Sequence, residues 1–392
     1  MKRKGQEKKT LRIAMFGQKS IPSRQGGVEI VVEELAVRMA EYGCKVTVYN
    51  RRGHHVSGKA FDEKHRHIWK KVRLRYVPTI DRKGLAAMSA SFFAAIAAAF
   101  GKYDIVHVHA EGPCAMIWLP KLTGKRCIAT IHGLDHQRAK WGKLASAYIM
   151  LGEKCAVKYA DEIIVLSREM QKYFWDTYKR KTCYIPNGVR KAELQKPDII
   201  QKKYGLSKDE YFLFLGRLVP EKGIRYLIEA FRQVKTDRKL VIAGGSSDTA
   251  AFESELHKMA EGDARILFTG FVQGKELQEL YSNAYVYVLP SDLEGMPLGL
   301  LEAMSYGNCC LVSDIAECAF VAEGRAMLFQ KSNVDDLREK IQFLDADEKQ
   351  VAHYRTGIAD FVGETYNWEH VVRETLQLYQ NKNMTQQNRG IR

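Results

Sequence analysis

The sequence VYVLPSDLEGMPLGLLEAMSY, residues 286–306, contains the change from strand to helix on which the fold depends. The apolar run 286–289 has the length and composition of a buried strand. Pro297 suits the first turn of a helix, where the backbone N–H has no helical partner, and the residues that follow to Tyr306 favour a helix. The stretch therefore predicts a strand, a loop and a helix, which is the unit of a parallel sheet.

The same alternation of short apolar runs and helical patterns extends in both directions from this stretch. In the second half, the expected strands are 212–215, 240–243, 266–268, 286–289 and 309–312. In the front half, they are 11–16, 45–50, 72–77, 105–109, 127–131 and 163–166. Apolar residues recur at helical spacing from Val28 to Met39, which predicts an amphipathic helix that ends at Gly43 and completes a βαβ unit.

The length of 392 residues predicts two domains of similar size. We expect an N-terminal domain in residues 1–190, a linker at 191–204 and a second domain in 205–365. A helix in 366–381 is expected to pack back on the body, before a tail at 382–392. The expected fold class is α/β, with two doubly wound, Rossmann-like domains facing each other across a cleft, because parallel sheets bind ligands at the carboxyl ends of their strands.

The charge is concentrated in the front half of the chain. Residues 1–190 carry 36 Lys and Arg against 16 Asp and Glu, a net charge of +20, whereas the remainder has a net charge of −5. This predicts an anionic partner, such as nucleic acid, acidic lipid or a pyrophosphate-bearing substrate, or else a basic face that contacts only solvent. Nucleic acid is disfavoured because the five tryptophans are scattered and no aromatic and basic residues alternate on one strand.

Composition also excludes several classes of protein. With 46% hydrophobic and 27% charged residues, the chain is not mainly disordered. Its eight cysteines form no CxxC pair, which favours reduced thiols in a cytoplasm over disulfides or a zinc site. The start of the chain does not have the pattern of a signal peptide. Residues 85–100 are apolar but too short to span a bilayer, so they form either a buried helix or one resting in a membrane interface.

Glycines follow the first expected strand, in the segment GQKSIPSRQGG at 17–27. Gly26 and Gly27 allow close approach of the backbone to a ligand, and the helix start behind them favours an anion. A tight turn without a ligand would also use two glycines, and the segment is not the dinucleotide-binding GxGxxG pattern.

A second strand-to-helix turn, GRLVPEKG at 216–223, carries Arg217 and Lys222. A guanidinium and an ammonium at this place are able to bind a diphosphate, although both side chains would also be normal in solvent.

Two carboxylates flank the helix start at Pro297. Glu294 lies in the preceding loop and Glu302 lies inside the helix, eight residues later. A phosphate against the N–H groups of Leu298, Gly299 and Leu300 would place hydroxyl-bearing rings beside both acids, and carboxylates accept paired hydroxyls well. The only D-x-D, Asp345 and Asp347, falls after an expected helix and away from the strand ends, so we reject it as a metal site.

These residues resemble a known family. The motifs of residues 216–223, with Glu294 and Glu302 in the E-x7-E arrangement, resemble the retaining nucleotide-sugar glycosyltransferases of family 4, which have the GT-B architecture. The resemblance covers about residues 11–379. The front half is similar to the bacterial rhamnosyltransferase-like subgroup through 17–27, Glu33-Glu34-Leu35 and the run HGLDHQRAKW at 132–141.

The resemblance implies a role for each matching residue. Arg217 and Lys222 would stabilise the leaving diphosphate without a metal or other cofactor, Glu302 would bind the ribose, and Glu294 would hold the transferred sugar. Gly26 and Gly27 would let the front domain close over the donor, and His132 would face the reacting carbon. Met296, Leu298, Gly299 and Leu300 complete the expected substrate-binding set.

The resemblance also predicts partners. The donor is expected to be a nucleotide-diphosphate sugar and the acceptor a glycan or a polyprenyl-pyrophosphate-linked saccharide, used in surface polysaccharide synthesis. The basic front half and residues 85–100 suit contact with anionic lipid on the inner face of the plasma membrane, for a protein that is otherwise cytoplasmic.

His132 stands where the subgroup often has an acidic residue, which predicts a donor other than dTDP-rhamnose, and a ribose-binding Glu302 favours UDP or GDP. No carboxylate nucleophile is evident, which favours front-face attack. An alternative function is that of another GT-B enzyme, such as a sugar-nucleotide epimerase, which would use a similar cleft.

Overall fold

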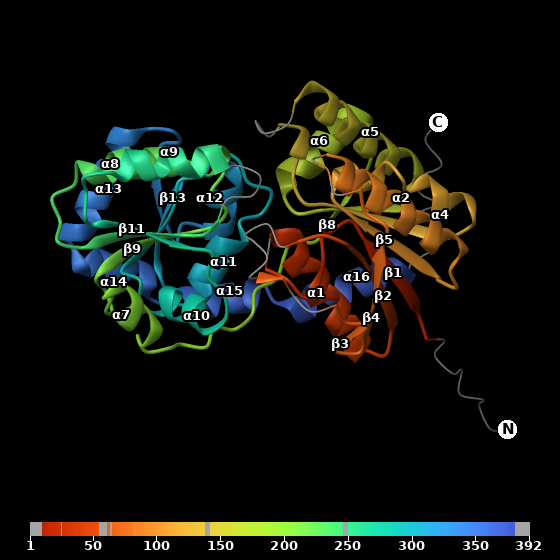
Figure 1. Ribbon diagram of the computed structural model, residues 1–392, viewed down its shortest axis with the longest axis horizontal. Helices are drawn as coiled ribbons and strands as arrows, with labels where there is room; N and C mark the ends of the chain where they lie inside the picture. Colours follow the sequence, from red (N-terminus) through yellow and green to blue (C-terminus); the bar gives the residue numbers. More distant parts are fainter. Residues whose placement is uncertain are drawn as a thin grey trace.

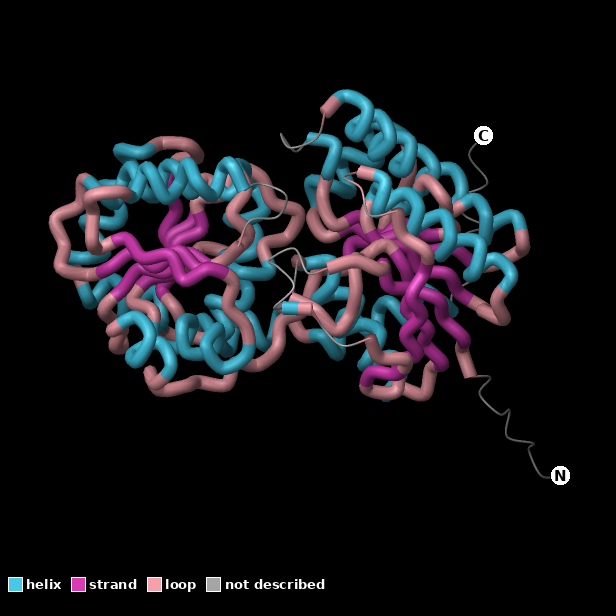
Figure 2. The backbone as a smooth tube through the Cα atoms, in the orientation of Figure 1, coloured by secondary structure: helices cyan, strands magenta, loops and turns pink. Residues whose placement is uncertain are grey.

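The computed structural model describes residues 10–24, 26–54, 61–62, 65–80, 82, 84–137, 142–245 and 250–380. The expected tail at 382–392 and residues 138–141 of the run quoted above lie outside this range. Figure 1 shows two lobes side by side, and Figure 2 shows that each contains a central sheet with helices on both faces. This is the expected pair of Rossmann-like domains.

The front domain contains an eight-stranded sheet in the order β3-β4-β2-β1-β5-β6-β7-β8. Its strands are β1 (Arg12–Phe16), β2 (Lys45–Arg51), β3 (Ile68–Trp69), β4 (Val72–Val77), β5 (Ile105–His109), β6 (Arg126–Ile131), β7 (Glu162–Val165) and β8 (Cys183–Tyr184). All neighbouring pairs are parallel except β3 with β4. Strands β5 and β6 are buried almost throughout, as expected for a parallel sheet covered on both faces.

The helices of this domain connect successive strands. They are α1 (Gly27–Glu41), α2 (Leu85–Phe100), α3 (Glu111–Cys114), α4 (Trp118–Leu122), the 3-10 turn η2 (Asp135–Gln137), α5 (Lys143–Tyr159) and α6 (Arg168–Tyr178). Helix α1 begins at the glycine pair and lies on the face of the sheet opposite to α2 and α5 (Figure 1).

The second domain contains a six-stranded parallel sheet in the order β11-β10-β9-β12-β13-β14. Its strands are β9 (Tyr211–Leu215), β10 (Lys239–Ala243), β11 (Ile266–Gly270), β12 (Val286–Leu289), β13 (Cys309–Ser313) and β14 (Met327–Phe329). Its helices are α7 (Ile199–Tyr204), η3 (Pro220–Lys222), α8 (Ile224–Arg232), α9 (Ala250–Ala260), α10 (Gly274–Asn283), α11 (Leu298–Ser305), α12 (Ala316–Ala322), α13 (Val334–Ala346), α14 (Glu348–Arg355) and α15 (Ile358–Thr365).

The chain crosses between the domains twice, and the two crossings lie together. The N–H of Val189 donates to the carbonyl of Tyr366 at 2.8 Å, and Gly188 lies so close to Trp368 that a Cβ there would be 2.6 Å from the indole. Helix α16 (Trp368–Gln380) then packs against α1 and joins the hydrophobic core of the front domain (Figure 1). Helix α16 therefore returns the chain from the second domain to the core of the first.

Every strand expected from the sequence is present, with its bounds shifted by two residues at most. Strands β3, β8 and β14 were not expected, because each has only two or three residues and carries no periodicity of its own. The expected linker at 191–204 also contains α7. The N–H groups of Asp198 and Ile200 donate to the buried carboxylate of Glu279 on α10, so this part of the linker packs on the second domain.

Helix α2 has an alanine-rich inner face and an aromatic outer face. Ala94, Ala95 and Ala98 are buried against the sheet, whereas Phe92, Phe93 and Phe100 are exposed. In the described part of the chain, none of the helices has both the length and the apolar composition needed to cross a membrane.

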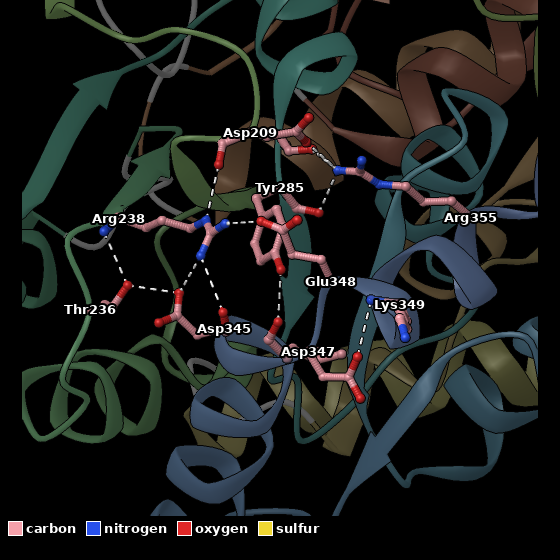
Figure 3. A network of polar contacts seen from close by, with 11 residues as sticks. Asp209, Thr236, Arg238, Tyr285, Asp345, Asp347, Glu348, Lys349 and Arg355 are labelled. Atoms are coloured by element: carbon pink, nitrogen blue, oxygen red, sulfur yellow. Dashed lines mark hydrogen bonds and ion pairs between the residues drawn. The ribbon is translucent and has the colours of Figure 1, made fainter.

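The acids of the rejected D-x-D have structural partners, as Figure 3 shows. Asp345 accepts from Arg238 and from the hydroxyl of Thr236, both at 2.8 Å, and Arg238 stacks on Tyr285 at 3.6 Å from its ring centroid. Asp347 accepts from the N–H groups at the start of α14. Tyr285 directly precedes β12, so this network lies at the amino end of the sheet, opposite to the loops that carry Lys222 and Glu294.

Candidate active site

One cavity lies between the two domains, at the carboxyl ends of both sheets. Of the residues expected from the sequence, it is lined by Gly26, Gly27, His132, Arg217, Lys222, Glu294, Met296, Leu298, Gly299 and Glu302. These positions come from loops that are far apart in the sequence and belong to both domains. The parallel sheets bring them together because each loop follows the carboxyl end of its own strand.

Lys222 and Glu294 form an ion pair at the centre of the cavity wall. The Lys222 ammonium lies 2.5 Å from Glu294 Oε1, and the hydroxyl of Ser291 donates to the same oxygen at 2.6 Å. Lys222 ends the turn η3, where Gly223 adopts φ +66° and approaches the Pro290 carbonyl too closely for any Cβ. The glycine thus allows the β9–α8 and β12–α11 loops to meet.

Glu302 is held by a residue from the other domain. Its Oε1 accepts from Arg24 at 2.9 Å, and its Oε2 accepts from the hydroxyl of Tyr281 at 3.3 Å. Tyr281 is fully buried and stacks on Tyr306, at 5.2 Å between ring centroids. Burial, followed by the charge of Glu302, raises the pKa of Tyr281, so its hydroxyl stays protonated and donates.

The opening turn of α11 faces the cavity through two of its three expected residues. Leu298 and Gly299 line the cavity, and the first N–H groups of a helix have no helical carbonyl to bind. Leu300 does not belong to this set, because its side chain is fully buried and its N–H donates to the Pro297 carbonyl at 3.0 Å. The helix itself uses that donor, and the expectation that Leu300 binds substrate stays a prediction.

The glycine pair places the front domain close to this turn. A Cβ on Gly27 would lie 3.2 Å from the side chain of Leu298, and one on Gly295 would lie 1.7 Å from the His132 carbonyl oxygen. Glu29, in the first turn of α1, accepts from the N–H of Lys19 at 2.8 Å and so fixes the preceding loop. The contact at Gly295 depends on the absence of a side chain, whereas at Gly27 a small shift of the Leu298 side chain would make room for a Cβ.

His132 lies in the cavity wall and leads into a row of buried histidines. Its Nε2 is 3.1 Å from Nδ1 of His109, whose ring lies 4.1 Å from that of His107. His107 is bound by Thr130 at 2.7 Å and by the hydroxyl of Tyr379 at 2.6 Å. Burial, followed by the charge of His132, lowers the pKa of His107 to about 3. His107 and His109 are fully buried, so His132 is the member of this row that reaches the cavity.

Sequence reasoning missed several lining residues. Arg24 lines the cavity and lies in the glycine segment at 17–27. Its position two residues before the glycine pair was the one signal in the sequence that could have indicated a role in binding an anion. Tyr281 on α10 and Asn187 carry no motif. The N–H of Asn187 donates to the sulfur of Met296 at 3.0 Å, which ties the first crossing to the β12–α11 loop.

Each half of the chain matches the model of a known glycosyltransferase family. Residues 25–193 match the family model described as Glycosyltransferase Family 4, and residues 196–360 match Glycosyl transferases group 1. The uncharacterized glycosyltransferase YqgM of Bacillus subtilis is 31% identical over 219 residues, covering 54% of this chain and 59% of that protein.

Two further relatives have named reactions. The UDP-Gal:alpha-D-GlcNAc-diphosphoundecaprenol alpha-1,3-galactosyltransferase of Escherichia coli is 30% identical over 254 residues, covering 60% of this chain and 64% of that protein. The N,N'-diacetylbacillosaminyl-diphospho-undecaprenol alpha-1,3-N-acetylgalactosaminyltransferase of Campylobacter jejuni is 30% identical over 208 residues, covering 50% of this chain and 54% of that protein.

Solved structures agree on the fold. Sucrose-phosphate synthase from Thermosynechococcus elongatus superposes with a TM-score of 0.74 at 23% identity, covering 94% of this chain and 98% of that one. Anabaena Alr3699/HepE, solved with UDP-glucose, superposes with a TM-score of 0.76 at 16% identity, covering 94% and 99%. The chain therefore shares its fold of two Rossmann-like domains with solved GT-B glycosyltransferases, and its two halves match the models of Glycosyltransferase Family 4 and of Glycosyl transferases group 1.

Proposed function

We propose that this protein moves a hexosyl or deoxyhexosyl group from a nucleotide-diphosphate sugar to a hydroxyl of a glycan or lipid-linked saccharide, with retention at the anomeric carbon, in surface polysaccharide synthesis. One observation carries this proposal. The E-x7-E acids, Lys222 and the opening turn of α11 line one cavity together with the glycine pair of the front domain.

On this proposal, Lys222 and Arg217 bind the diphosphate at the start of α11. Charge develops on the leaving diphosphate in the transition state, so fixed cations and N–H donors at that place lower the barrier. The Lys222 ammonium pairs with Glu294, and the diphosphate would take over part of this interaction. These groups supply the positive charge that a metal ion supplies in other transferases, so we propose metal-independent donor binding.

Glu302 is proposed to bind the ribose hydroxyls of the donor. A carboxylate accepts from two neighbouring hydroxyls at once, which a 2′-deoxyribose does not offer. Arg24 donates to Glu302 Oε1, and the ribose hydroxyls would take over this oxygen. We therefore propose a UDP or GDP sugar rather than a deoxyribonucleotide donor.

Front-face attack is the proposed route to retention. Among the described residues that line the cavity, the carboxylates are Glu294 and Glu302, and both lie on the second domain. The front domain contributes His132 instead of an acid. A double displacement needs a nucleophile on the opposite face of the sugar, whereas front-face attack needs only the departing diphosphate to accept the proton of the acceptor hydroxyl.

A lipid-linked acceptor is supported by the relatives and by the charge of the front half. Two relatives act, by their names, on sugars linked to diphosphoundecaprenol. The net charge of +20 and the exposed Phe92, Phe93 and Phe100 of α2 suit a peripheral contact with an anionic membrane. We propose a cytoplasmic protein that works at the inner face of the plasma membrane.

A transfer assay tests the function. The protein is incubated with UDP- and GDP-sugars and an undecaprenyl-diphosphate saccharide, and the anomeric configuration of the product is read by NMR. We expect a glycoside with the configuration of the donor. An epimerised nucleotide sugar formed without acceptor would replace this proposal with an epimerase, and an inverted product would contradict retention.

A further inference from the structure

A second cluster of polar side chains lies in the front domain, away from the residues proposed to bind the donor. Glu111 begins α3, His136 lies in η2 after β6, and Glu153 lies on α5. Each offers one ligand atom, and these atoms all lie within 4.8 Å of one another. The side chains of both glutamates are fully buried, and that of His136 is 15% exposed.

The three ligand atoms have no hydrogen-bond partner, although they are buried. They are Glu111 Oε1, His136 Nδ1 and Glu153 Oε2. The opposite oxygens of both carboxylates are bound: Glu111 Oε2 accepts from the N–H of Asp135 at 2.7 Å, and Glu153 Oε1 accepts from Tyr178 and, at 3.0 Å, from Tyr173. These bonds orient the two carboxylates, so that one oxygen of each is directed at the point between the three ligand atoms. Hydrogen bonds from neighbouring residues orient metal ligands in proteins in the same way.

The distances fit a shared ion better than they fit hydrogen bonds. His136 Nδ1 lies 3.6 Å from Glu111 Oε1 and 3.7 Å from Glu153 Oε2, which is too long for an N–H···O bond. Two atoms that are each roughly 2.1 Å from a metal ion, with an angle of about 120° between them, have this separation. Buried polar atoms are almost always paired, so three unpaired atoms around one point require a partner.

The charge at this place also calls for a cation. Two buried carboxylates face each other beside Asp135, and separating such charges from water is costly unless an opposite charge accompanies them. A divalent ion would balance the two carboxylates completely.

We propose that Glu111, His136 and Glu153 bind one divalent first-row metal ion in the front domain. One imidazole and two carboxylates are ligands that Zn²⁺, Mn²⁺ and Fe²⁺ accept. The ion joins the end of β5, the segment after His132 and helix α5, so its role is to hold the loop after His132 in place in the front domain. It has no part in binding the donor diphosphate, and the proposal does not depend on the proposed function.

The site is tested on the unaltered protein without any assay of transfer. Protein stripped with a chelator is titrated with Zn²⁺, Mn²⁺ and Mg²⁺ by calorimetry, and its melting temperature is followed alongside. We expect one ion of Zn²⁺ or Mn²⁺ per chain with a rise in melting temperature, and no comparable effect of Mg²⁺. His136→Ala and Glu153→Gln should each weaken binding by at least ~100-fold.

Two controls separate the alternatives. His370→Ala removes an exposed imidazole on α16 and should bind the ion as the wild type does. If the stripped wild type binds neither Zn²⁺ nor Mn²⁺, the proposal is overturned, and a Glu153→Gln variant as stable as the wild type would then show that the two carboxylates share a proton. Because the first titration uses unaltered protein, a variant that fails to fold leaves the test intact.

Discussion

At the scale of single residues, the ion pair between Lys222 and Glu294 links stability to the proposed chemistry. Only 17% of the Lys222 side chain and 10% of the Glu294 side chain are exposed. Removal of one partner from such a pair leaves an unbalanced buried charge, whereas removal of both does not. The pair therefore allows the cost to folding to be separated from the cost to transfer.

We predict that Lys222→Ala lowers both the melting temperature and the transfer rate. Loss of the ammonium partner of the buried Glu294 carboxylate should cost on the order of 3 kcal/mol of unfolding free energy. The double variant Lys222→Met/Glu294→Gln should regain most of this stability while its kcat stays at least ~100-fold below the wild type, because the group that stabilises the leaving diphosphate is missing. Urea denaturation and a transfer assay measure both effects. Wild-type activity in the double variant would disprove the assigned role.

His107 provides a prediction on pH. Its pKa is lowered from 6.5 to about 3 in the folded protein, so between these values the unfolded chain binds a proton that the folded chain excludes. The unfolding free energy should therefore fall as the pH falls below about 6.5, with a contribution of up to ~1.4 kcal/mol per pH unit from this one group.

His107→Gln replaces the imidazole by an amide, which still forms hydrogen bonds but does not titrate. Urea denaturation at several pH values between 4 and 7 should give a flatter profile for the variant than for the wild type. Titration of the carboxyl groups is common to both proteins and cancels in the comparison. Parallel profiles would show that His107 does not carry this dependence.

The sequence allowed most of the candidate site to be predicted, because its residues stand at fixed places in strand-to-helix turns. The spacing of Glu294 and Glu302 around a helix start is such a signal. Leu300 does not line the cavity, and the sequence alone did not show that its N–H bonds to the Pro297 carbonyl within the helix. Tyr281 was missed because an aromatic residue on an amphipathic helix looks like any core residue.

At the scale of elements, the long parallel strands were predictable because burial on both faces makes them continuous apolar runs. Strand β8, with two residues, and strand β14, with three, are too short to produce a pattern. Their existence depends on pairing with β7 and β13, which is tertiary information. Helix α7 was likewise hidden in a polar stretch, since it is stabilised through Glu279 and not through its own periodicity.

Helix α2 gives a prediction at this scale. Phe92 and Phe93 are exposed on its outer face, while the alanines on its inner face pack on the sheet. Phe92→Ser/Phe93→Ser should reduce flotation with anionic vesicles at low salt by several-fold and leave the melting temperature nearly unchanged, because the change lies at the surface. Trp175→Ser, which removes an exposed aromatic from α6, is the matched control. Equal flotation of all three proteins would exclude α2 as the contact.

At the scale of the whole molecule, the two domains contact each other at a glycine, Gly295, where no larger residue fits. Gly295 belongs to the second domain, and a Cβ there would lie 1.7 Å from the carbonyl oxygen of His132 in the front domain. The sequence predicted two domains and a cleft, but the closeness of this contact follows only from how the domains are placed.

We predict that Gly295→Ala forces the domains apart. The radius of gyration measured by small-angle X-ray scattering should increase. KM for the donor should rise at least tenfold, because the residues proposed to bind the donor come from both domains. Gly363→Ala on α15 has open space around the new methyl group and serves as the control. An unchanged scattering curve together with an unchanged KM would show that the interface yields without opening.

The central claim is that a nucleotide diphosphate lies against the start of α11 with its ribose on Glu302. The most direct test compares the binding of UDP and GDP with that of their 2′-deoxy forms, in the wild type and in Glu302→Gln, by calorimetry. We predict that the wild type prefers the ribose form by at least about tenfold, equal to about 1.4 kcal/mol, and that the variant loses most of this preference. A preference of the same size in both proteins, or no binding of either diphosphate, would contradict the account.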